Sequence, residues 1–371
     1  MFEKAIEVIK LIEKKGFKAY IVGGYVRDIY LSLNASDIDI ATSATPMDLV
    51  KIFKKNVIID EKYGSTKLNY KNCCFDITTF RRDIKYKDNR KPTKIEYVDN
   101  IGEDLNRRDF TINTMCMDKD GNIIDVFNAK KDINSKLIKC VGNSDEKIKE
   151  DSLRILRAIR FATILNFKLE KELEKAIKKN ASNLKSLSFH RKKEELNYIF
   201  RSKNYEYGIS LLSKYRLDKY LDISGLKHIK QTSDVLGMWA QIKYGEDYPF
   251  SRLEKETINK IREMLIYNKI DNYSLYKYGI LISLTVGEIL GIDKKNILKG
   301  YDELKIHSES DIVYNNFDIS KILNCEPSHK TKLILNDIEY KILSNELDNN
   351  KKSIEEYVIK KYGGTVWIIP F

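Results

Sequence analysis

A glycine pair near the start of the chain has the setting of a phosphate-binding turn. Residues 19–22 (AYIV) form a short apolar run typical of a strand, and Gly23 and Gly24 follow it directly. Glycine permits a tight turn and lets backbone N–H groups come close to phosphate oxygens. The helix predicted at residues 26–33 would direct its positive N-terminal end toward the same anion. These features together predict a site for a nucleoside triphosphate.

Two aspartates follow the predicted helix, in the order Asp37, Ile38, Asp39, Ile40. On a strand both carboxylates would leave one face while the isoleucines go to the other. Two hard oxygen ligands side by side suit Mg2+ that bridges substrate phosphates, which phosphoryl or nucleotidyl transfer needs. Alone, each motif is more often a plain turn or a solvated strand edge, so the interpretation depends on what lies downstream.

Two further blocks follow in chain order, at residues 107–113 (RRDFTIN) and 150–161 (EDSLRILRAIRF). With the first motif they resemble the class II tRNA nucleotidyltransferases, the family of bacterial CCA-adding enzymes and poly(A) polymerases, over roughly residues 18–200. The resemblance implies an α+β fold. A polymerase-β-like nucleotidyltransferase head with a mixed sheet would be followed by an elongated, all-helical neck, body and tail.

The resemblance also implies roles for three carboxylates. Asp37 and Asp39 would ligate two Mg2+ ions, one lowering the pKa of an RNA 3′-hydroxyl and the other neutralising the triphosphate and the leaving pyrophosphate. Asp76 opens a strand-like run at the place where the family usually carries a Glu or Asp, so it is the candidate third ligand. The alternative for Asp76 is an ordinary edge-strand carboxylate.

The nucleotide-binding positions that the resemblance implies begin with those of the first block. These would shape the triphosphate and ribose pocket: Gly23, Gly24, Arg27, Asp28 and Ser43. Arg27 would lie either on phosphate or against Asp28, and the alternative for this pair is a solvated ion pair on a helix.

In the second block, Arg108, Asp109 and Asn113 correspond to family positions associated with ribose and phosphate contact. Asp109 accepts hydrogen bonds and Asn113 both accepts and donates them, so together they can hold the 2′-hydroxyl that marks a ribonucleotide. A helix start with Asp109 as its cap is compatible with the same pattern.

The third block predicts base selection. Asp151 and Arg154 lie three residues apart on a predicted helix, close enough to present an acceptor and a fork of donors to one base edge. Cytosine and adenine offer an amino donor beside an unprotonated ring nitrogen, whereas uracil and guanine present the reverse pattern. The pair resembles the family's protein-template motif; its alternative is a surface ion pair of low worth. Arg157 and Arg160 continue the face and match family positions that approach the nucleotide.

Two further segments refine the interpretation. Arg191 and Glu195 fit a family element thought to brace the head against the neck, which we interpret as structural. Residues 82–92 resemble the complete flexible loop needed when the pocket must switch from CTP to ATP. This favours addition of C, C and A to tRNA first, addition of A alone second, and poly(A) addition third.

Two functions from other classes remain open. A nucleotidyltransferase acting on a small molecule would share the carboxylates without needing a long basic helical tail. An inactive RNA-binding protein would be expected to have lost a metal carboxylate, and none is lost here.

The periodicity predicts a mixed head and a helical remainder. We expect one sheet in the head, with strands at residues 19–22, 37–41, 57–59, 66–70, 74–78, 95–97 and 123–125. Helices are expected at residues 46–53, 146–165, 169–187, 191–200, 205–214, 253–267, 275–290, 293–305, 330–343 and 349–361. The predicted domains are a catalytic head (1–132), a neck with the nucleotide-selecting helix (133–200) and a tRNA-binding body and tail (201–371).

Composition agrees with a nucleic-acid partner without selecting one. The chain has 371 residues, 66 Lys plus Arg against 54 Asp plus Glu, and a net charge of +12. Such a balance favours a polyanion, or simply solvated basic faces. The five cysteines form no spaced metal quartet, and no uncharged run is long enough to span a membrane. We therefore expect a cytoplasmic protein that acts on the tRNA acceptor end with CTP, ATP and Mg2+, with no membrane or protein partner implied.

Overall fold

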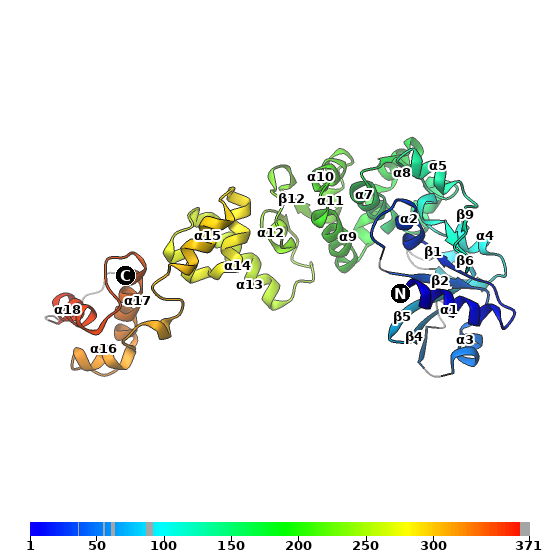
Figure 1. Cartoon of the computed structure of the whole chain (residues 1–371). Helices are drawn as coiled ribbons and strands as arrows, with labels where there is room; N and C mark the ends of the chain where they lie inside the picture. Colours follow the sequence, from blue (N-terminus) through cyan, green and yellow to red (C-terminus); the bar gives the residue numbers. More distant parts are fainter. Residues whose placement is uncertain (36, 55, 61–63, 87–91, 364–371) are drawn as a thin grey trace. The chain divides into compact units, whose positions relative to one another are not determined.

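The computed structural model describes residues 1–371 except 36, 55, 61–63, 87–91 and 364–371 (Figure 1). The chain divides into two compact units. The first is Met1–Ser224 with Tyr244–Pro249, and the second is Gly225–Lys243 with Phe250–Phe371. Each unit is described by itself below.

The head is built on a seven-stranded sheet of order β3-β4-β5-β2-β1-β8-β9. Strand β2 is antiparallel to β1 and parallel to β5, so the sheet is mixed, as expected. The bounds of its strands are β1 Ala19–Val22, β2 Asp39–Thr42, β3 Val57–Asp60, β4 Ser65–Tyr70, β5 Cys73–Thr79, β8 Cys116–Met117 and β9 Ile123–Ile124.

The prediction of a single sheet in the head was wrong, because β6 (Arg81–Tyr86) and β7 (Pro92–Tyr97) form a separate hairpin. Among the head helices, α1 (Phe2–Glu13) shows why the sequence folds as it does. Its buried residues are Ala5, Val8, Ile9 and Ile12, a helical stripe that packs on the sheet. The other head helices are α2 Gly24–Tyr30, α3 Pro46–Phe53, α4 Ile101–Asn106 and α5 Ala129–Asn134, with a 3-10 turn at Thr111–Asn113.

Further helices follow in the same unit. They are α6 Ser144–Glu150, α7 Leu153–Leu165, α8 Lys171–Asn180, α9 Phe189–Arg201, α10 Tyr205–Lys214 and α11 Asp218–Leu221, with a 3-10 turn at Ala181–Ser186. Helix α7 packs against α9 and α10. Two short strands, β10 (Leu137–Ile138) and β11 (Lys168–Leu169), pair in parallel, and β12 (Ile223–Ser224) and β13 (Lys243–Tyr244) come later in the chain.

The expected continuous helix over residues 146–165 was wrong: it breaks at Asp151 into α6 and α7. Asp151 has an extended backbone, with φ −146° and ψ 107°. Its Oδ1 accepts a hydrogen bond from Leu153 N at 2.9 Å, which satisfies an amide at the start of α7. A short polar side chain that bonds its own neighbouring backbone competes with the helix, and here it wins.

The second unit is helical. Its helices are α12 Val235–Ala240, α13 Arg252–Tyr267, α14 Asn272–Leu290, α15 Lys294–Asp302, α16 Asn316–Ile322, α17 His329–Leu343 and α18 Lys351–Tyr362, with 3-10 turns at Leu226–His228 and Glu309–Asp311. Gly279 kinks α14 with φ 76° and ψ 168°, a conformation that needs glycine. None of the helices described is long and apolar enough to cross a membrane.

Candidate active site

One cavity of about 530 Å³ in the first unit gathers residues from all three sequence blocks. Its lining comes from the β1–α2 turn, the start of β2, the segment around the Thr111–Asn113 turn, α7 and α9. The described residues that line it are Gly23, Gly24, Arg27, Asp37, Asp39, Arg108, Asp109, Asn113, Asp151, Arg154, Arg157, Arg160, Phe161, Ile164 and Tyr198. Most of the residues singled out in the sequence thus meet at one place.

The turn after β1 depends on glycine. Gly23 has φ 79° and ψ −136°, a conformation that other residues rarely adopt. A Cβ at this position would also lie 3.2 Å from the Arg108 side chain. Gly23 therefore lets the chain turn into α2 and lets a guanidinium from the second block approach the turn closely.

The two aspartates of the first motif lie at the edge of the cavity, but only Asp39 is in a strand. Strand β1 ends at Val22, opposite Asp39, and the chain turns away at Gly23. Asp37 lies before the first residue of β2, although both carboxylates line the cavity. The expected strand start at residue 37 was therefore two residues too early.

Asp76 lies beside Asp39 as its register partner on the parallel strand β5, outside the cavity lining. Burial raises the pKa of Asp39, the Arg108 charge lowers it, and the nearby Asp76 and Asp37 raise it further. Mutual repulsion among carboxylates is what a divalent cation relieves. In the parts of the chain that the structure describes, no three His, Cys, Asp or Glu side chains could by themselves hold an ion.

These carboxylates nevertheless fit Mg2+, which is usually held by one or two carboxylates together with water and substrate phosphates. The hard oxygen donors lie beside the glycine turn, where a triphosphate would enter.

Arg27 is braced rather than free. Its Nε donates to Asp28 Oδ1 at 2.8 Å, and its Nη1 donates to Asn113 Oδ1 at 2.6 Å. The guanidinium also lies 5.2 Å from the centroid of the Phe161 ring. Arg27 is thus held by Asp28 and Asn113 at the cavity, and its contact with a phosphate stays a prediction.

Asp109 is the best-satisfied carboxylate of the site. It accepts hydrogen bonds from Arg157 Nε at 2.6 Å, from Phe110 N at 2.8 Å and from Asn113 Nδ2 at 3.1 Å. Burial alone would raise its pKa, but the Arg157 charge and these hydrogen bonds lower the pKa to about 2. Asp109 is thereby ionised at neutral pH and ties α7 to the segment that carries Asn113.

We expect the Asp109→Asn substitution to reveal this link as a pH-dependent loss of stability. A carboxylate whose pKa is lowered on folding stabilises the chain above its unfolded pKa, and the stabilisation disappears as the pH falls through the folded value. The shift from 3.8 to about 2 corresponds to roughly 2 kcal/mol.

The measurement is the urea midpoint of wild type and Asp109→Asn as a function of pH. The difference between them should shrink from about pH 4 to about pH 2. Asp60→Asn, which removes an exposed carboxylate of β3, is the control. A difference that does not change with pH would contradict the assignment.

Arg154 is held against the protein by several acceptors. Its Nη1 donates to Lys147 O at 2.7 Å and to Glu150 Oε2 at 2.6 Å, and its Nη2 donates to Arg107 O at 3.1 Å. The ion pair of Arg154 is therefore with Glu150, and the last bond reaches the second block. Burial raises the pKa of Asp151. Asp151 and Arg154 line the same cavity although they are not on one helix, because the chain breaks between α6 and α7 at Asp151.

The cavity contains residues that the sequence did not single out: Phe161, Ile164 and Tyr198. Phe161 is the last residue of the third block and lies on the same face of α7 as Arg154 and Arg157. Helical spacing could therefore have predicted that it lines the cavity. Tyr198 comes from α9, and no local pattern marked it.

Glu195, from the element expected to brace the head, forms an ion pair with Arg160. Arg160 Nη1 donates to Glu195 Oε1 at 3.1 Å, which links α7 to α9 within the neck. Ser43 is also displaced from its expected place. It follows the far end of β2, where its Oγ accepts from Lys18 N at 2.9 Å, and it is not in the cavity lining. We leave Ser43 out of the proposed site.

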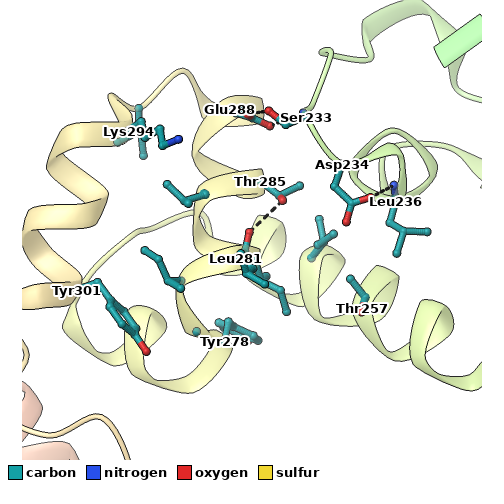
Figure 2. A pocket seen from close by; sticks show the side chains of 16 residues that line it. Ser233, Asp234, Leu236, Thr257, Tyr278, Leu281, Thr285, Glu288, Lys294 and Tyr301 are labelled. Atoms are coloured by element: carbon teal, nitrogen blue, oxygen red, sulfur yellow. Dashed lines mark hydrogen bonds between the residues drawn. The ribbon is translucent and has the colours of Figure 1, made fainter. Parts of the chain in front are cut away.

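A second cavity, of about 700 Å³, lies in the other unit among α12, α13, α14 and α15 (Figure 2). Its acidic side chains are already engaged: Glu288 accepts from Ser233 N at 2.8 Å, and Asp234 accepts from Leu236 N at 2.9 Å. Leu281 and other leucines and isoleucines make up half of the rest of its lining. It is larger than the first cavity but lacks paired carboxylates beside a cluster of arginines.

The fold and this site define the class of protein. Residues 19–139 match the family model of the Poly A polymerase head domain. Residues 166–222 match the model described as a probable RNA and SrmB-binding site of polymerase A, and residues 246–358 match the model of tRNA nucleotidyltransferase domain 2. The chain is therefore a nucleotidyltransferase, as predicted.

Full-length relatives narrow the class. The chain is 31% identical to a CCA-adding enzyme of Streptococcus uberis, with 97% of each chain covered. It is 33% identical to one of Ligilactobacillus salivarius, covering 96% of this chain and 95% of the relative. A crystal structure of the Bacillus stearothermophilus CCA-adding enzyme in complex with CTP superimposes with a TM-score of 0.87 at 26% identity, covering 97% of both chains. The chain belongs to the family of CCA-adding enzymes, and the predicted α+β fold class is confirmed.

Proposed function

We propose that this chain adds C, C and A to the 3′ end of tRNA from CTP and ATP, with release of pyrophosphate, in the cavity of the first unit. The observation that carries the proposal is the convergence there of Asp37 and Asp39 with Asp151 and Arg154. The first pair suits reaction at a phosphate, and the second suits recognition of a base edge. Family membership supports the same activity.

Mg2+ is the proposed cofactor. Asp37 and Asp39 would hold it, with Asp76 as the neighbouring carboxylate on β5. When bound, the metal would activate the RNA 3′-hydroxyl and neutralise charge on the triphosphate. Arg27, Arg108, Arg157 and Arg160 supply the remaining positive charge along the cavity, and Gly23 and Gly24 leave room for phosphate oxygens beside the turn.

Base selection is proposed to use a rigid template. Arg154 is only 7% exposed and is held by the acceptors from Lys147, Glu150 and Arg107, so its guanidinium has a fixed direction. Asp151 is fixed by its bond to Leu153 N. Asp151 can accept a hydrogen bond from an amino group, and Arg154 can donate one to an unprotonated ring nitrogen. Cytosine and adenine both present this pair of groups.

The ribose is proposed to lie against Asp109 and Asn113, whose polar atoms are already aligned by their mutual bond of 3.1 Å. We assign catalysis to residues 1–132, nucleotide selection to 133–200 and tRNA binding to 201–371. We also place the protein in the cytoplasm, since all five of its cysteines are free thiols.

The direct test is incubation of the purified chain with Mg2+, with CTP and ATP together, one of them labelled, and with tRNA transcripts of three kinds. These end before the first C, after CC and after CCA. The first transcript should gain three nucleotides and then stop, the second should gain only A, and the third should gain none. Continued A addition to the third transcript would contradict the proposal and indicate poly(A) synthesis.

The loop between β6 and β7 gives a further prediction. This loop, residues 87–91, lies outside the described part of the chain. If this loop permits the switch from CTP to ATP, deletion of residues 85–91 should leave C addition largely intact and stop the products at CC. The measurement is product length on the transcript that ends before the first C. Equal loss of C and A addition would mean that the hairpin only supports the fold.

A further inference from the structure

Three side chains at the cavity form a layered stack across two helices. The Arg160 guanidinium carbon lies 4.5 Å from the centroid of the Phe161 ring and 4.8 Å from that of the Tyr198 ring. Glu195 holds Arg160 from the side through the 3.1 Å bond. Phe161 is only 8% exposed, whereas Tyr198 is 45% exposed. Tyr198 is therefore much more exposed than Phe161, and it lines the cavity in contact with Arg160.

The stack lies away from the base-reading pair. Arg160 follows Arg154 by six residues on α7, a rise of about 9 Å along the helix axis. Tyr198 contacts Arg160 from α9. If the incoming base contacts Asp151 and Arg154, the Tyr198 ring is available to a second base.

We propose that Tyr198 is a substrate-binding residue that stacks on the 3′-terminal base of the RNA being extended. This inference rests on the proposed assignment of Asp151 and Arg154 to the incoming nucleotide. The base at the growing end changes from one addition to the next, so its contact has to tolerate different bases. Stacking on an aromatic ring has this property, because every base has a π-face.

The environment of Tyr198 suits the role. A tyrosine ring provides a rigid contact area at low conformational-entropy cost. Arg160 fills the space beneath the ring, and Glu195 fixes Arg160, so the platform is preorganised. The apolar side chain of Ile164 also lines this end of the cavity.

The test compares wild type, Tyr198→Ala and Tyr198→Phe on two tRNA transcripts. One ends in a normal nucleotide, and the other carries an abasic ribonucleotide at its 3′ end. With the normal end, Tyr198→Ala should raise the KM for tRNA by roughly 5-fold to 150-fold, the value of one base stacked on an aromatic ring. The KM for CTP and the ratios among the four nucleotides should stay unchanged. Tyr198→Phe should behave as wild type, because it keeps the ring.

The abasic transcript isolates the contact. Wild type should lose affinity for it by the same factor, and Tyr198→Ala should lose nothing further. Tyr70→Ala, at a tyrosine of β4 in the same unit and outside the cavity lining, is the matched control and should leave both KM values unchanged.

An effect of Tyr198→Ala on the KM for CTP would overturn the proposal and assign the ring to the incoming base. An undiminished penalty with the abasic end would overturn it as well, since the role would then be structural. Failure of wild type to extend the normal transcript would instead reject the proposed function itself.

Discussion

Asp39→Asn is expected to abolish transfer of every nucleotide while leaving the fold and tRNA binding nearly intact. Asp39 lines the cavity together with Asp37, and it is the register partner of Asp76 on the neighbouring strand β5. Asn keeps the shape but removes the charge that neutralises a metal ion. A lost metal ligand should cost several kcal/mol in the transition state, a rate loss above roughly 100-fold.

The measurement is single-turnover incorporation of CTP and of ATP on matched tRNA ends. Asp60→Asn, in β3 of the same sheet, is the control and should retain the wild-type rate. Binding of labelled tRNA by both variants separates chemistry from recognition. A rate in Asp39→Asn above about one hundredth of wild type would remove Asp39 from the metal site.

Arg154→Ala is expected to lower discrimination against UTP and GTP as well as the rate. The guanidinium attracts the unprotonated ring nitrogen of cytosine and adenine and repels the protonated nitrogen of the other two bases. One good contact of this type discriminates by about 1 to 3 kcal/mol, so selectivity should fall roughly 5-fold to 150-fold. CTP and ATP use should suffer together, because one pair serves both bases.

The structural contacts of Arg154 require a matched control. Glu150→Gln breaks the ion pair of 2.6 Å but keeps the guanidinium, so its nucleotide ratios should stay close to those of wild type. Asp151→Asn keeps an oxygen for Leu153 N but exchanges the other oxygen for a donor, so it should weaken C and A incorporation. Unchanged ratios in both Arg154→Ala and Asp151→Asn would reduce the pair to a structural role.

Much of the site could be predicted from the sequence because its residues lie in short, ordered blocks. The glycine turn, the two aspartates and the arginines of α7 each have a spacing that matches one face of an element. The strand run, the turn and the aspartates also lie close in sequence, so local geometry alone brings them near one another.

The errors arose where side chains compete with the regular backbone or where the tertiary fold decides. Aspartate can occur within a helix, but Asp151 accepts a hydrogen bond from Leu153 N, and the helix is interrupted there between α6 and α7. Ser43 follows the aspartates closely, yet β2 carries it to the opposite end of the strand from Asp39. The position of Ser43 depends on the length of β2, and the sequence motif does not specify that length.

Tyr198 shows the limit of local patterns most clearly. It reaches the cavity only because α9 packs on α7, a contact between residues far apart in the chain. Its neighbours in sequence have no spacing that marks a site. The short helices α12 and α16 were also missed, since six or seven residues give too little periodicity to detect.

We propose that one cavity accepts both CTP and ATP through a single pair of side chains, Asp151 and Arg154. Calorimetric titration of the wild-type chain with each nucleotide in Mg2+, followed by displacement with the other, tests it most directly. We expect one nucleotide bound per chain, full mutual displacement, and loss of affinity for both nucleotides in Arg154→Ala. Simultaneous binding of CTP and ATP, or loss of only one of them in Arg154→Ala, would contradict it.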